Sequence, residues 1–330
     1  MNTLTEPIRV GLLGSGNFVR NQHLNNLVRH PGFAIRGVAD PNLESAREVA
    51  SEAGEARAVA DPHELIADPD LDLVFIVTPH FTHAELAIAA AKAGKHIYCE
   101  KPMGLTEEEC LAVKAAVEEA GVVFLAGYNR SVAPFTRTIR ERLAKLDAPM
   151  LIHHRFADWN PYSTGWLIDE RLSGGRIIGE GGHSLDTMCR LVGADPVRVY
   201  AEGGNFAEPS PTQAPDSALI TLGFPDGSAG TLLISSVANN DYPKEELIVT
   251  CANTTFVVKD FQQLTIYGPE GTEEEILPER DRGLGAMLDA AYGAIRAGEE
   301  NPTRPELALR TSRLTFAAVR SIRERRLVEV

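Results

Sequence analysis

Two kinds of hydrophobic pattern alternate along the first 125 or so residues. Short apolar runs with β-branched residues, as at 8–13 and 73–77, are typical of buried parallel strands. Segments with apolar side chains at helical spacing, as at 17–30 and 84–93, separate them. Further strands are expected at 33–39, 96–99 and 122–126, and further helices at 43–53 and from Thr106 to Gly121. The alternation predicts an α/β fold with a doubly wound parallel sheet over residues 1–128.

The pattern changes in the second part of the chain. A strand at 150–156 and a helix at 177–191 come first, and short alternating segments follow between 197 and 267. Turn residues such as Pro225-Asp-Gly227 separate these segments, which is typical of an antiparallel sheet. Helical patterns return at 284–296 and 306–325. We therefore expect a second α/β domain, residues 129–330, with a large, mostly antiparallel sheet.

Composition excludes several classes of protein. The 330 residues include 32 Lys plus Arg and 46 Asp plus Glu, for a net charge of −14, so a nucleic-acid partner is not expected. No apolar stretch approaches the about 20 residues of a membrane span, and the polar N-terminus lacks the pattern of a signal peptide. The four cysteines form no CxxC pair, which favours a reducing compartment. We expect a soluble, cytoplasmic protein.

A glycine-rich turn follows the first strand and begins the first helix. Gly14 fits the tight turn, and Gly16 fits the position where the backbone must approach a dinucleotide pyrophosphate. Val19 stands where a small residue is usual, which predicts a slightly wider contact between helix and strand. The residues expected to hold the phosphates are Gly14, Gly16, Asn17 and Phe18.

An acidic residue ends the second strand. Asp40, 21 residues beyond Val19, is placed to accept hydrogen bonds from both ribose hydroxyls of an adenosine. Its charge would repel a 2′-phosphate, so NAD is favoured over NADP. S-adenosylmethionine is the chief competitor, because methyltransferases also place an acid after the second strand.

Several motifs together resemble one family. The segments Thr78-Pro-His-Phe-Thr-His83, Ala93-Gly-Lys-His96 and Glu100-Lys101-Pro102 resemble the core signature of the Gfo/Idh/MocA oxidoreductases. Gly127-Tyr-Asn-Arg130 and the glycine-rich stretch that ends in His183-Ser-Leu-Asp186 are similar to two further motifs of that family. The resemblance implies an N-terminal Rossmann domain, a C-terminal domain with an open sheet, and NAD(P)-dependent hydride transfer on sugars, polyols or related compounds. It also suggests a homodimer or homotetramer, since the open face of the sheet commonly pairs.

The resemblance assigns roles around Lys101. Lys101 follows a strand at its carboxyl end, where an ammonium can stabilise charge on the reacting oxygen. Glu100 is expected to hold the nicotinamide ribose or to orient Lys101, and a cis bond is expected between Lys101 and Pro102. Thr78 and Pro79 are expected beside the same ribose, and His83 is expected to cap or orient residues around the cofactor.

His183 is the expected base for the hydroxyl proton, because imidazole has an ordinary pKa near about 6.5. The family commonly has Asp four residues before this histidine, where this chain has Gly179. Glu180 and Asp186 lie on the same predicted helical face, and of the two we favour Glu180 as the supporting carboxylate.

Other residues have weaker roles at this stage. Asn129 and Arg130 are candidates for binding substrate hydroxyls or for bracing the domain junction. Trp159 and Trp166 are candidates for stacking on a sugar ring. The pair His80 and His83 has no further ligand near in sequence, so no metal site is expected.

Three function classes remain open beside the methyltransferase. The leading hypothesis is an NAD-dependent dehydrogenase acting on a sugar, sugar derivative or cyclitol. The alternatives are a non-catalytic NAD-binding sensor and an NAD-dependent glycoside hydrolase that recycles its cofactor within each turnover.

Overall fold

The computed structural model describes residues 6–54, 56–159, 165–207 and 214–330. The chain forms two compact units. The first comprises Met1–Gly127 together with Leu284–Leu309, and the second comprises Tyr128–Gly283 together with Arg310–Val330. The segment Leu284–Leu309, which we expected in the second domain, therefore packs with the first unit.

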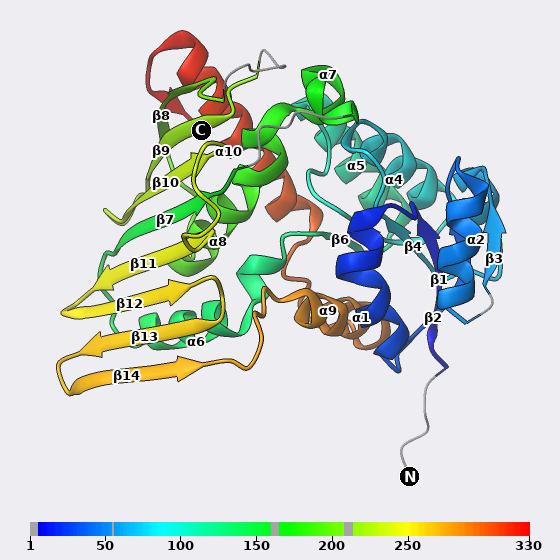
Figure 1. Ribbon diagram of the computed structural model, residues 1–330, viewed down its shortest axis with the longest axis horizontal. Helices are drawn as coiled ribbons and strands as arrows, with labels where there is room; N and C mark the ends of the chain where they lie inside the picture. The colour runs from blue at the N-terminus through cyan, green and yellow to red at the C-terminus, as the bar shows by residue number, and fades with distance from the viewer. Residues whose placement is uncertain (1–5, 55, 160–164, 208–213) are drawn as a thin grey trace. The chain divides into compact units, whose positions relative to one another are not determined.

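The first unit holds a six-stranded parallel sheet in the order β3-β2-β1-β4-β5-β6 (Figure 1). Its strands are β1 (Ile8–Leu13), β2 (Phe33–Ala39), β3 (Arg57–Val59), β4 (Leu73–Ile76), β5 (His96–Cys99) and β6 (Phe124–Ala126). The order reverses direction at β1, which confirms the predicted doubly wound sheet. In such a sheet, ligands bind at the carboxyl ends of the strands near the reversal, between β1 and β4.

Helices connect and cover these strands. They are α1 (Leu24–Arg29), α2 (Leu43–Glu52), α3 (Pro62–Ile66), α4 (His83–Lys92), α5 (Glu107–Ala120) and α9 (Leu284–Ala297). The Thr106 hydroxyl accepts a hydrogen bond from the Glu109 N–H and caps α5, as the sequence predicts. The Glu109 carboxylate returns to the N–H of Leu105, one residue earlier than a capping box requires.

The first helix departs from the regular helix expected at 17–30. Between Asn17 and α1, residues Val19–His23 form a π-helical segment. A π turn inserts an extra residue and rotates the side chains that follow it. In this chain the rotated segment carries His23 into the interior, where it is 2% exposed.

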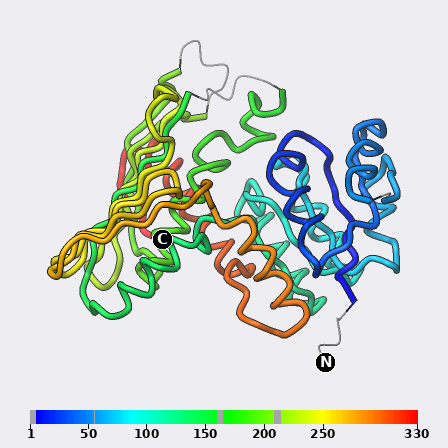
Figure 2. Tube along the Cα trace, turned by 60° about the horizontal axis from the view of Figure 1, so that its bottom comes forward, coloured from blue at the N-terminus to red at the C-terminus, as the bar shows by residue number. Residues whose placement is uncertain are grey.

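The edge strand β6 is covered by a distant part of the chain. Ala126 donates its N–H to the carbonyl of Thr303 (3.1 Å), and the Asn301 amide donates to the carbonyl of Phe124 (2.6 Å). Helix α9, which leads towards this segment, lies beside α1 in both views (Figures 1 and 2). These contacts are why Leu284–Leu309 belongs to the first unit.

The second unit holds a nine-stranded sheet in the order β14-β13-β12-β11-β7-β10-β9-β8-β15. Its strands are β7 (Leu151–Ala157), β8 (Arg198–Gly204), β9 (Ser217–Gly223), β10 (Ala229–Ser235), β11 (Glu245–Cys251), β12 (Thr254–Lys259), β13 (Gln263–Gly268), β14 (Gly271–Ile276) and β15 (Val328–Glu329). All neighbours are antiparallel except β7 and β10, which run parallel. The predicted large, mostly antiparallel sheet is confirmed.

Helices cover one face of this sheet. They are α6 (Pro134–Leu143), α8 (Gly182–Val192) and the part of α10 (Pro305–Glu324) that follows Leu309. Their apolar side chains join those of alternate strand positions in one core, with Phe135, Leu185 and Leu314 as examples. The predicted helix at 177–191 is divided, since a π-helical segment, η5 (Ile177–Gly181), precedes α8. On the opposite face the strands present exposed residues that include Leu151 and Leu219.

Across the described ranges, none of the helices is both long and apolar enough to cross a membrane.

Candidate functional site

The glycine turn after β1 has a closed side and an open side. Gly14 has a φ of +100°, and a Cβ there would lie 2.3 Å from the carbonyl oxygen of Val77. Only glycine fits this position, because the β1 turn passes directly over the end of β4. Gly16 is exposed, and a Cβ there would meet nothing within 4 Å. The turn thus leaves space beside Gly16, with Asn17 and Phe18 exposed next to it at the start of the helix.

Asp40 joins the glycine turn to the end of β2. One carboxylate oxygen accepts the Ser15 N–H (2.9 Å) and the other accepts the Asn42 N–H (2.8 Å). Each oxygen keeps a second lone pair for a ligand hydroxyl. Asp40 therefore shapes the turn as well as presenting charge beside it, a structural role that sequence reasoning did not identify.

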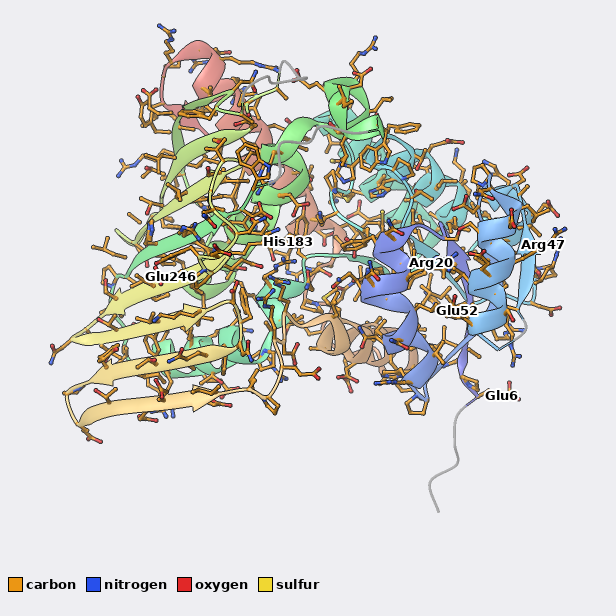
Figure 3. The ribbon with its side chains drawn as sticks, viewed as in Figure 1. Glu6, Arg20, Arg47, Glu52, His183 and Glu246 are labelled. Carbon is orange, nitrogen blue, oxygen red and sulfur yellow. The ribbon has the colours of Figure 1, made fainter. Side chains whose placement is uncertain are left out.

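A cation beside this turn, Arg20, is paired with carboxylates. Arg20, in the π segment, donates to the carbonyl of Ser15 and pairs with Glu48 (2.9 Å) of α2. It also pairs with Glu52 (3.1 Å) of α2, and Figure 3 labels Arg20 and Glu52. Two carboxylates beside one guanidinium, with Asp40 near them, disfavour a 2′-phosphate. The residues present fit NAD: an open glycine turn at a helix start and an acid at the end of β2.

Glu100 is a buried carboxylate at the carboxyl end of β5. It lies 2.9 Å from Nε2 of His23 and accepts the Lys101 N–H (3.2 Å). Burial opposes ionisation, but the His23 hydrogen bond and the charges of His23 and Lys101 hold the pKa of Glu100 below its ordinary value. A Cβ on Gly127 would lie 2.8 Å from this carboxylate, so Gly127 leaves room for it. No local pattern points to His23, which lies 77 residues earlier in the chain.

Lys101 follows Glu100 and is 7% exposed. The Lys101–Pro102 bond is cis, as the family resemblance implied. His83 bridges this turn to the end of β4, because its two ring nitrogens each lie 2.8 Å from a carbonyl oxygen, of Pro102 and of Thr78. Burial lowers the pKa of His83. His83 thus braces the turn that carries Lys101, and the Thr78 hydroxyl is held against Thr82 (2.6 Å), next to Pro79.

In the second unit, His183 contacts an arginine side chain. His183 lies on the first turn of α8 directly after the π segment and is 3% exposed. Its Nε2 lies 3.0 Å from Nη1 of Arg130, a residue of the 3₁₀ turn η3 (Asn129–Val132). The ring of Tyr128 meets the imidazole edge to face, with 6.1 Å between centroids.

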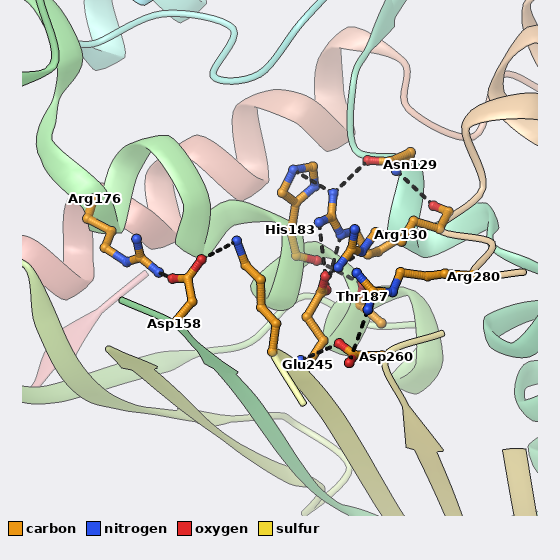
Figure 4. Close-up of polar contacts among 11 residues, drawn as sticks. Asn129, Arg130, Asp158, Arg176, His183, Thr187, Glu245, Asp260 and Arg280 are labelled. Atoms are coloured by element: carbon orange, nitrogen blue, oxygen red, sulfur yellow. Dashed lines mark hydrogen bonds and ion pairs between the residues drawn. The ribbon is translucent and has the colours of Figure 1, made fainter. Parts of the chain in front are cut away.

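Arg130 is held on three sides (Figure 4). Its Nε and Nη2 donate to the two carboxylate oxygens of Glu245, at 3.2 and 3.1 Å. Its Nη1 also donates to the side-chain oxygen of Asn129 (3.1 Å), whose amide donates to the carbonyl of Arg282 (2.8 Å). Asn129 and Arg130 therefore form contacts within the second unit. The two roles that the sequence left open for them, binding substrate hydroxyls and bracing the domain junction, remain predictions.

Glu245 is the buried anion of this group. The Nε of Arg282 lies 2.6 Å from one of its oxygens, so two guanidinium groups face a single carboxylate. Burial opposes ionisation, but the charges of Arg130 and Arg282 lower the pKa of Glu245 to about 2. The group keeps one excess positive charge at neutral pH.

The two carboxylates expected to support His183 lie on consecutive helical segments, Glu180 on η5 and Asp186 on α8. Asp186 is engaged elsewhere: its Oδ1 accepts from Arg310 (2.8 Å) and from the hydroxyl of Thr311 (2.9 Å), both on α10. Glu180 lies half-buried in η5, next to Gly179. The roles predicted for Glu180 and Asp186 remain predictions.

A second polar group continues from Glu245. Asp158 pairs with Arg176 and with Lys244 (2.6 Å), and Asp260 pairs with Arg280 (3.3 Å) (Figure 4). A surface pocket of about 420 Å³ is lined by residues of this group, among them Asp158, Tyr242, Lys244, Asp260 and Arg280. Its lining includes both donors and acceptors, which suits a ligand rich in hydroxyl groups.

The two tryptophans flank a stretch outside the described residues, 160–164. Trp159 is 57% exposed and donates its backbone N–H to Asn240. Trp166 is half-buried in η4 (Gly165–Ile168). Their proposed stacking on a sugar remains a prediction.

His154, on β7, is an unusual buried histidine. It is 0% exposed, and neither ring nitrogen has a hydrogen-bond partner within the described part of the chain. Burial lowers the pKa of His154 to about 4, with Arg130 adding to the effect. The imidazole is therefore neutral across the physiological range. In the described ranges, no three His, Cys, Asp or Glu side chains gather as a metal site requires.

Comparison with known families matches both units. Residues 8–128 match the oxidoreductase family with an NAD-binding Rossmann fold, and residues 136–273 match the GFO/IDH/MocA C-terminal domain.

Among individual proteins, the chain is 30% identical to the scyllo-inositol 2-dehydrogenase (NAD(+)) of Bacillus subtilis, over 84% of this chain and 81% of that protein. It is 29% identical to the 2,7-anhydro-N-acetylneuraminate hydratase of Escherichia coli, over 90% and 82% of the two chains. The crystal structure of a probable dehydrogenase from Thermotoga maritima is similar with a TM-score of 0.85, at 25% identity over 98% of both chains.

Proposed function

Because the chain belongs to the Gfo/Idh/MocA family of NAD-binding oxidoreductases, we propose that it transfers a hydride between NAD and a hydroxyl-bearing carbon of a sugar, sugar derivative or cyclitol. One observation carries the proposal for this chain. The sheet that presents the open glycine turn and Asp40 also carries a buried lysine, Lys101, at the carboxyl end of β5. In this proposal residues 1–128 bind the cofactor, and the part of residues 129–330 that lies in the second unit binds substrate.

The first unit would hold the cofactor. The helix start beside Gly16 offers N–H groups to the pyrophosphate, and Asp40 accepts from the adenosine ribose. Thr78, Pro79 and Glu100 would lie along the nicotinamide ribose. Bound NAD supplies the hydride acceptor, and the protein supplies orientation and charge.

Two groups would serve the substrate oxygen. Lys101 would donate a hydrogen bond to it and stabilise the negative charge that develops as its proton leaves. His183 would take that proton, as a neutral imidazole can. Lys101 lies in the turn that His83 braces, and His183 lies in the first turn of α8, so each is held before substrate arrives.

The substrate class is supported by the relatives and by the second unit. One relative is named for scyllo-inositol and another for a neuraminate derivative, both polyhydroxylated rings. The polar pocket beside Lys244 and Asp260 suits such a ring, and Trp159 offers an exposed aromatic face.

The test is a panel of cyclitols and sugars assayed for NADH at 340 nm. We expect stoichiometric NADH with NAD, and we expect Lys101→Met to lower kcat by about a hundredfold or more while most NAD affinity is kept. Lys114→Met, at a half-buried lysine of α5 paired with Glu118, is the matched control. Near-normal kcat in Lys101→Met on a confirmed substrate would contradict the assigned site.

A second candidate is a hydration or hydrolysis in which NADH is formed and consumed within one turnover. The similarity to a hydratase over 90% of this chain supports this second candidate. This second candidate predicts that substrate is consumed without accumulation of NADH. A non-catalytic sensor would bind NAD, consume no substrate and form no NADH.

We further propose a homodimer, or a tetramer built from dimers, formed through the open face of the nine-stranded sheet. Exposed apolar side chains on this face support it: Leu151, Tyr200, Leu219 and Tyr267. Light scattering should give at least twice the monomer mass, and Leu219→Glu should lower it. A cytoplasmic location is supported by the four cysteines, which are all buried and form no disulfide with one another.

A further inference from the structure

The donors of Arg130 are almost fully assigned. A guanidinium has five N–H groups in one plane. Two donate to the carboxylate of Glu245, and the two on Nη1 point to Asn129 and His183. Because these acceptors fix the plane from different directions, the guanidinium cannot turn without losing several charge-assisted bonds.

This arrangement decides which nitrogen of His183 carries the proton. Arginine stays protonated in proteins, so at a separation of 3.0 Å its Nη1 can only donate. Nε2 of His183 must then accept, and the single proton of the neutral ring lies on Nδ1. A second proton on Nε2 would set N–H against N–H and bring two cations together.

We propose that Glu245 and Arg130 are positioning residues that keep His183 neutral, with the proton on Nδ1 and the lone pair of Nε2 directed at Arg130. The role as base rests on the proposed function, whereas the tautomer does not. Where an aspartate before the histidine would hold the imidazole directly, this chain has Gly179, and Glu245 acts on the ring through a guanidinium. Glu245 is 115 residues from Arg130 in sequence, so no local motif reveals the pair.

The other charged groups around α8 do not reverse this preference. On η3 the charge is Arg130, and on β7 His154 is neutral above about pH 4. Asp186 on α8 is engaged by Arg310 of α10. Charged residues of α6 are all exposed: Arg137, Arg140, Glu141 and Arg142. On η5 and just before it lie Glu180, half-buried, and Arg176, which pairs with Asp158. Arg282 adds a second cation at Glu245, and β10 carries no titratable group.

The consequence for catalysis concerns the lone pair of Nε2. A substrate hydroxyl must replace the Arg130 N–H as its partner before proton transfer. In the transfer the O–H bond breaks, an Nε2–H bond forms, and the electron pair stays on oxygen. The resulting imidazolium then lies beside a guanidinium, which favours release of the proton to solvent once product leaves.

The direct test is side-chain NMR on ¹⁵N-histidine protein, with His183 assigned by the loss of its signals in His183→Gln. At pH 7.5, without substrate, we expect Nδ1 of His183 to be protonated and Nε2 to be unprotonated. Observation of the Nε2–H tautomer, or of a charged ring at that pH, would overturn the proposal. No catalytic activity is needed, so this result is independent of the dehydrogenase assay.

Variants test the cause. Arg130→Met removes the donor, and we expect the midpoint of His183 protonation to rise by about one pH unit or more, a tenfold change in the equilibrium. Arg142→Met, which removes an exposed arginine paired with Glu273, should leave the midpoint unchanged. An unchanged midpoint in a folded Arg130→Met protein would show that Arg130 does not set the protonation state.

Glu245 is tested by a pair of substitutions. Glu245→Gln keeps the size but loses the charge that clamps Arg130, and we expect a mixture of tautomers at His183. Glu245→Asp keeps the charge and should restore part of the single tautomer. On a confirmed substrate the same order should appear in kcat, with the acid limb of the pH profile of kcat/KM displaced in Glu245→Gln. Equal tautomer populations in wild type and Glu245→Gln would contradict the role of Glu245.

Discussion

Gly127 illustrates how one missing side chain supports a buried charge. Its Cα faces the carboxylate of Glu100 so closely that a Cβ would lie 2.8 Å from all three carboxylate atoms. The carboxylate could not retreat without losing its bond to His23. The glycine is therefore required by the Glu100 carboxylate rather than by a turn. The position of Gly127 in a sequence motif does not reveal this requirement.

Gly127→Ala should lower the free energy of unfolding by about 1–3 kcal/mol, because the added methyl overpacks a rigid site. Denaturant unfolding measures it. Gly285→Ala, on α9 where a Cβ meets nothing within 4 Å, is the matched control and should be neutral or slightly stabilising. Equal stability of the two variants would mean that Glu100 has room to move.

Asp40→Asn should narrow the preference for NAD over NADP. The amide oxygen can still accept the Ser15 N–H, whereas the Asn42 N–H loses its acceptor and the charge that repels a 2′-phosphate is lost. We expect weaker NAD binding and a smaller ratio of the two dissociation constants, measured by calorimetry. Equal affinity for both cofactors in the unmodified protein would contradict this reading of Asp40.

Local spacing revealed some site residues and not others. Gly14, Gly16 and Asp40 follow from a strand–turn–helix pattern, and Lys101 and His183 from motifs. His23 and Glu245 did not appear, because their partners lie 77 and 115 residues away and only the fold brings them together. Arg130 was named, but its contact with His183 across 53 residues was not.

At the scale of elements, the strands and helices with strong periodicity were predictable. Of the six parallel strands, only the short β3 was not predicted, because its three residues are too few to show a hydrophobic pattern. Helix α6 was missed for a different reason, since its sequence has four charged residues among ten and its apolar stripe is narrow. The π segments could not be read from periodicity, because one inserted residue changes the phase without changing composition.

Thr106→Ala tests the predicted start of α5. The hydroxyl satisfies the Glu109 N–H, and its loss should cost about 1 kcal/mol of unfolding free energy. Thermal or denaturant unfolding measures the change. Thr106→Ser keeps the hydroxyl and should remain within a few tenths of a kcal/mol of wild type. If Thr106→Ser lost as much unfolding free energy as Thr106→Ala, the effect would come from packing of the threonine methyl group and not from the hydroxyl.

At the scale of the molecule, buried histidines make the fold sensitive to acid. His154 has a folded pKa of about 4 against an ordinary value of 6.5, so the unfolded chain binds a proton that the folded chain refuses. Stability is therefore complete above about pH 6.5 and falls as pH drops towards 4. Glu245, with its pKa near 2, adds a loss only below its ordinary value of 4.5.

His154→Leu should flatten this dependence. Between pH 8 and pH 5 we expect the variant to lose about 2 kcal/mol less unfolding free energy than wild type, from one and a half units of linkage. His153→Leu is the matched control. His153 is next to His154 in sequence, but it is exposed on the opposite face of the sheet and is hydrogen-bonded to Thr231. An unchanged slope in His154→Leu would show that His154 is solvated or paired in solution.

Residues 301–303 cover the edge of β6, and this contact determines which fragments of the protein can fold on their own. A gene fragment that stops at Gly127 would encode every strand of the parallel sheet yet leave the backbone of Phe124 and Ala126 unpaired at a bare edge. Such edges recruit other chains, so we expect that fragment to aggregate on expression. A version in which a short flexible linker joins Gly127 to Leu284–Leu309 restores the cover and should remain monodisperse and bind NAD. Limited proteolysis of the whole protein should likewise release no stable piece ending near residue 127, although the fold changes there from one sheet to the next.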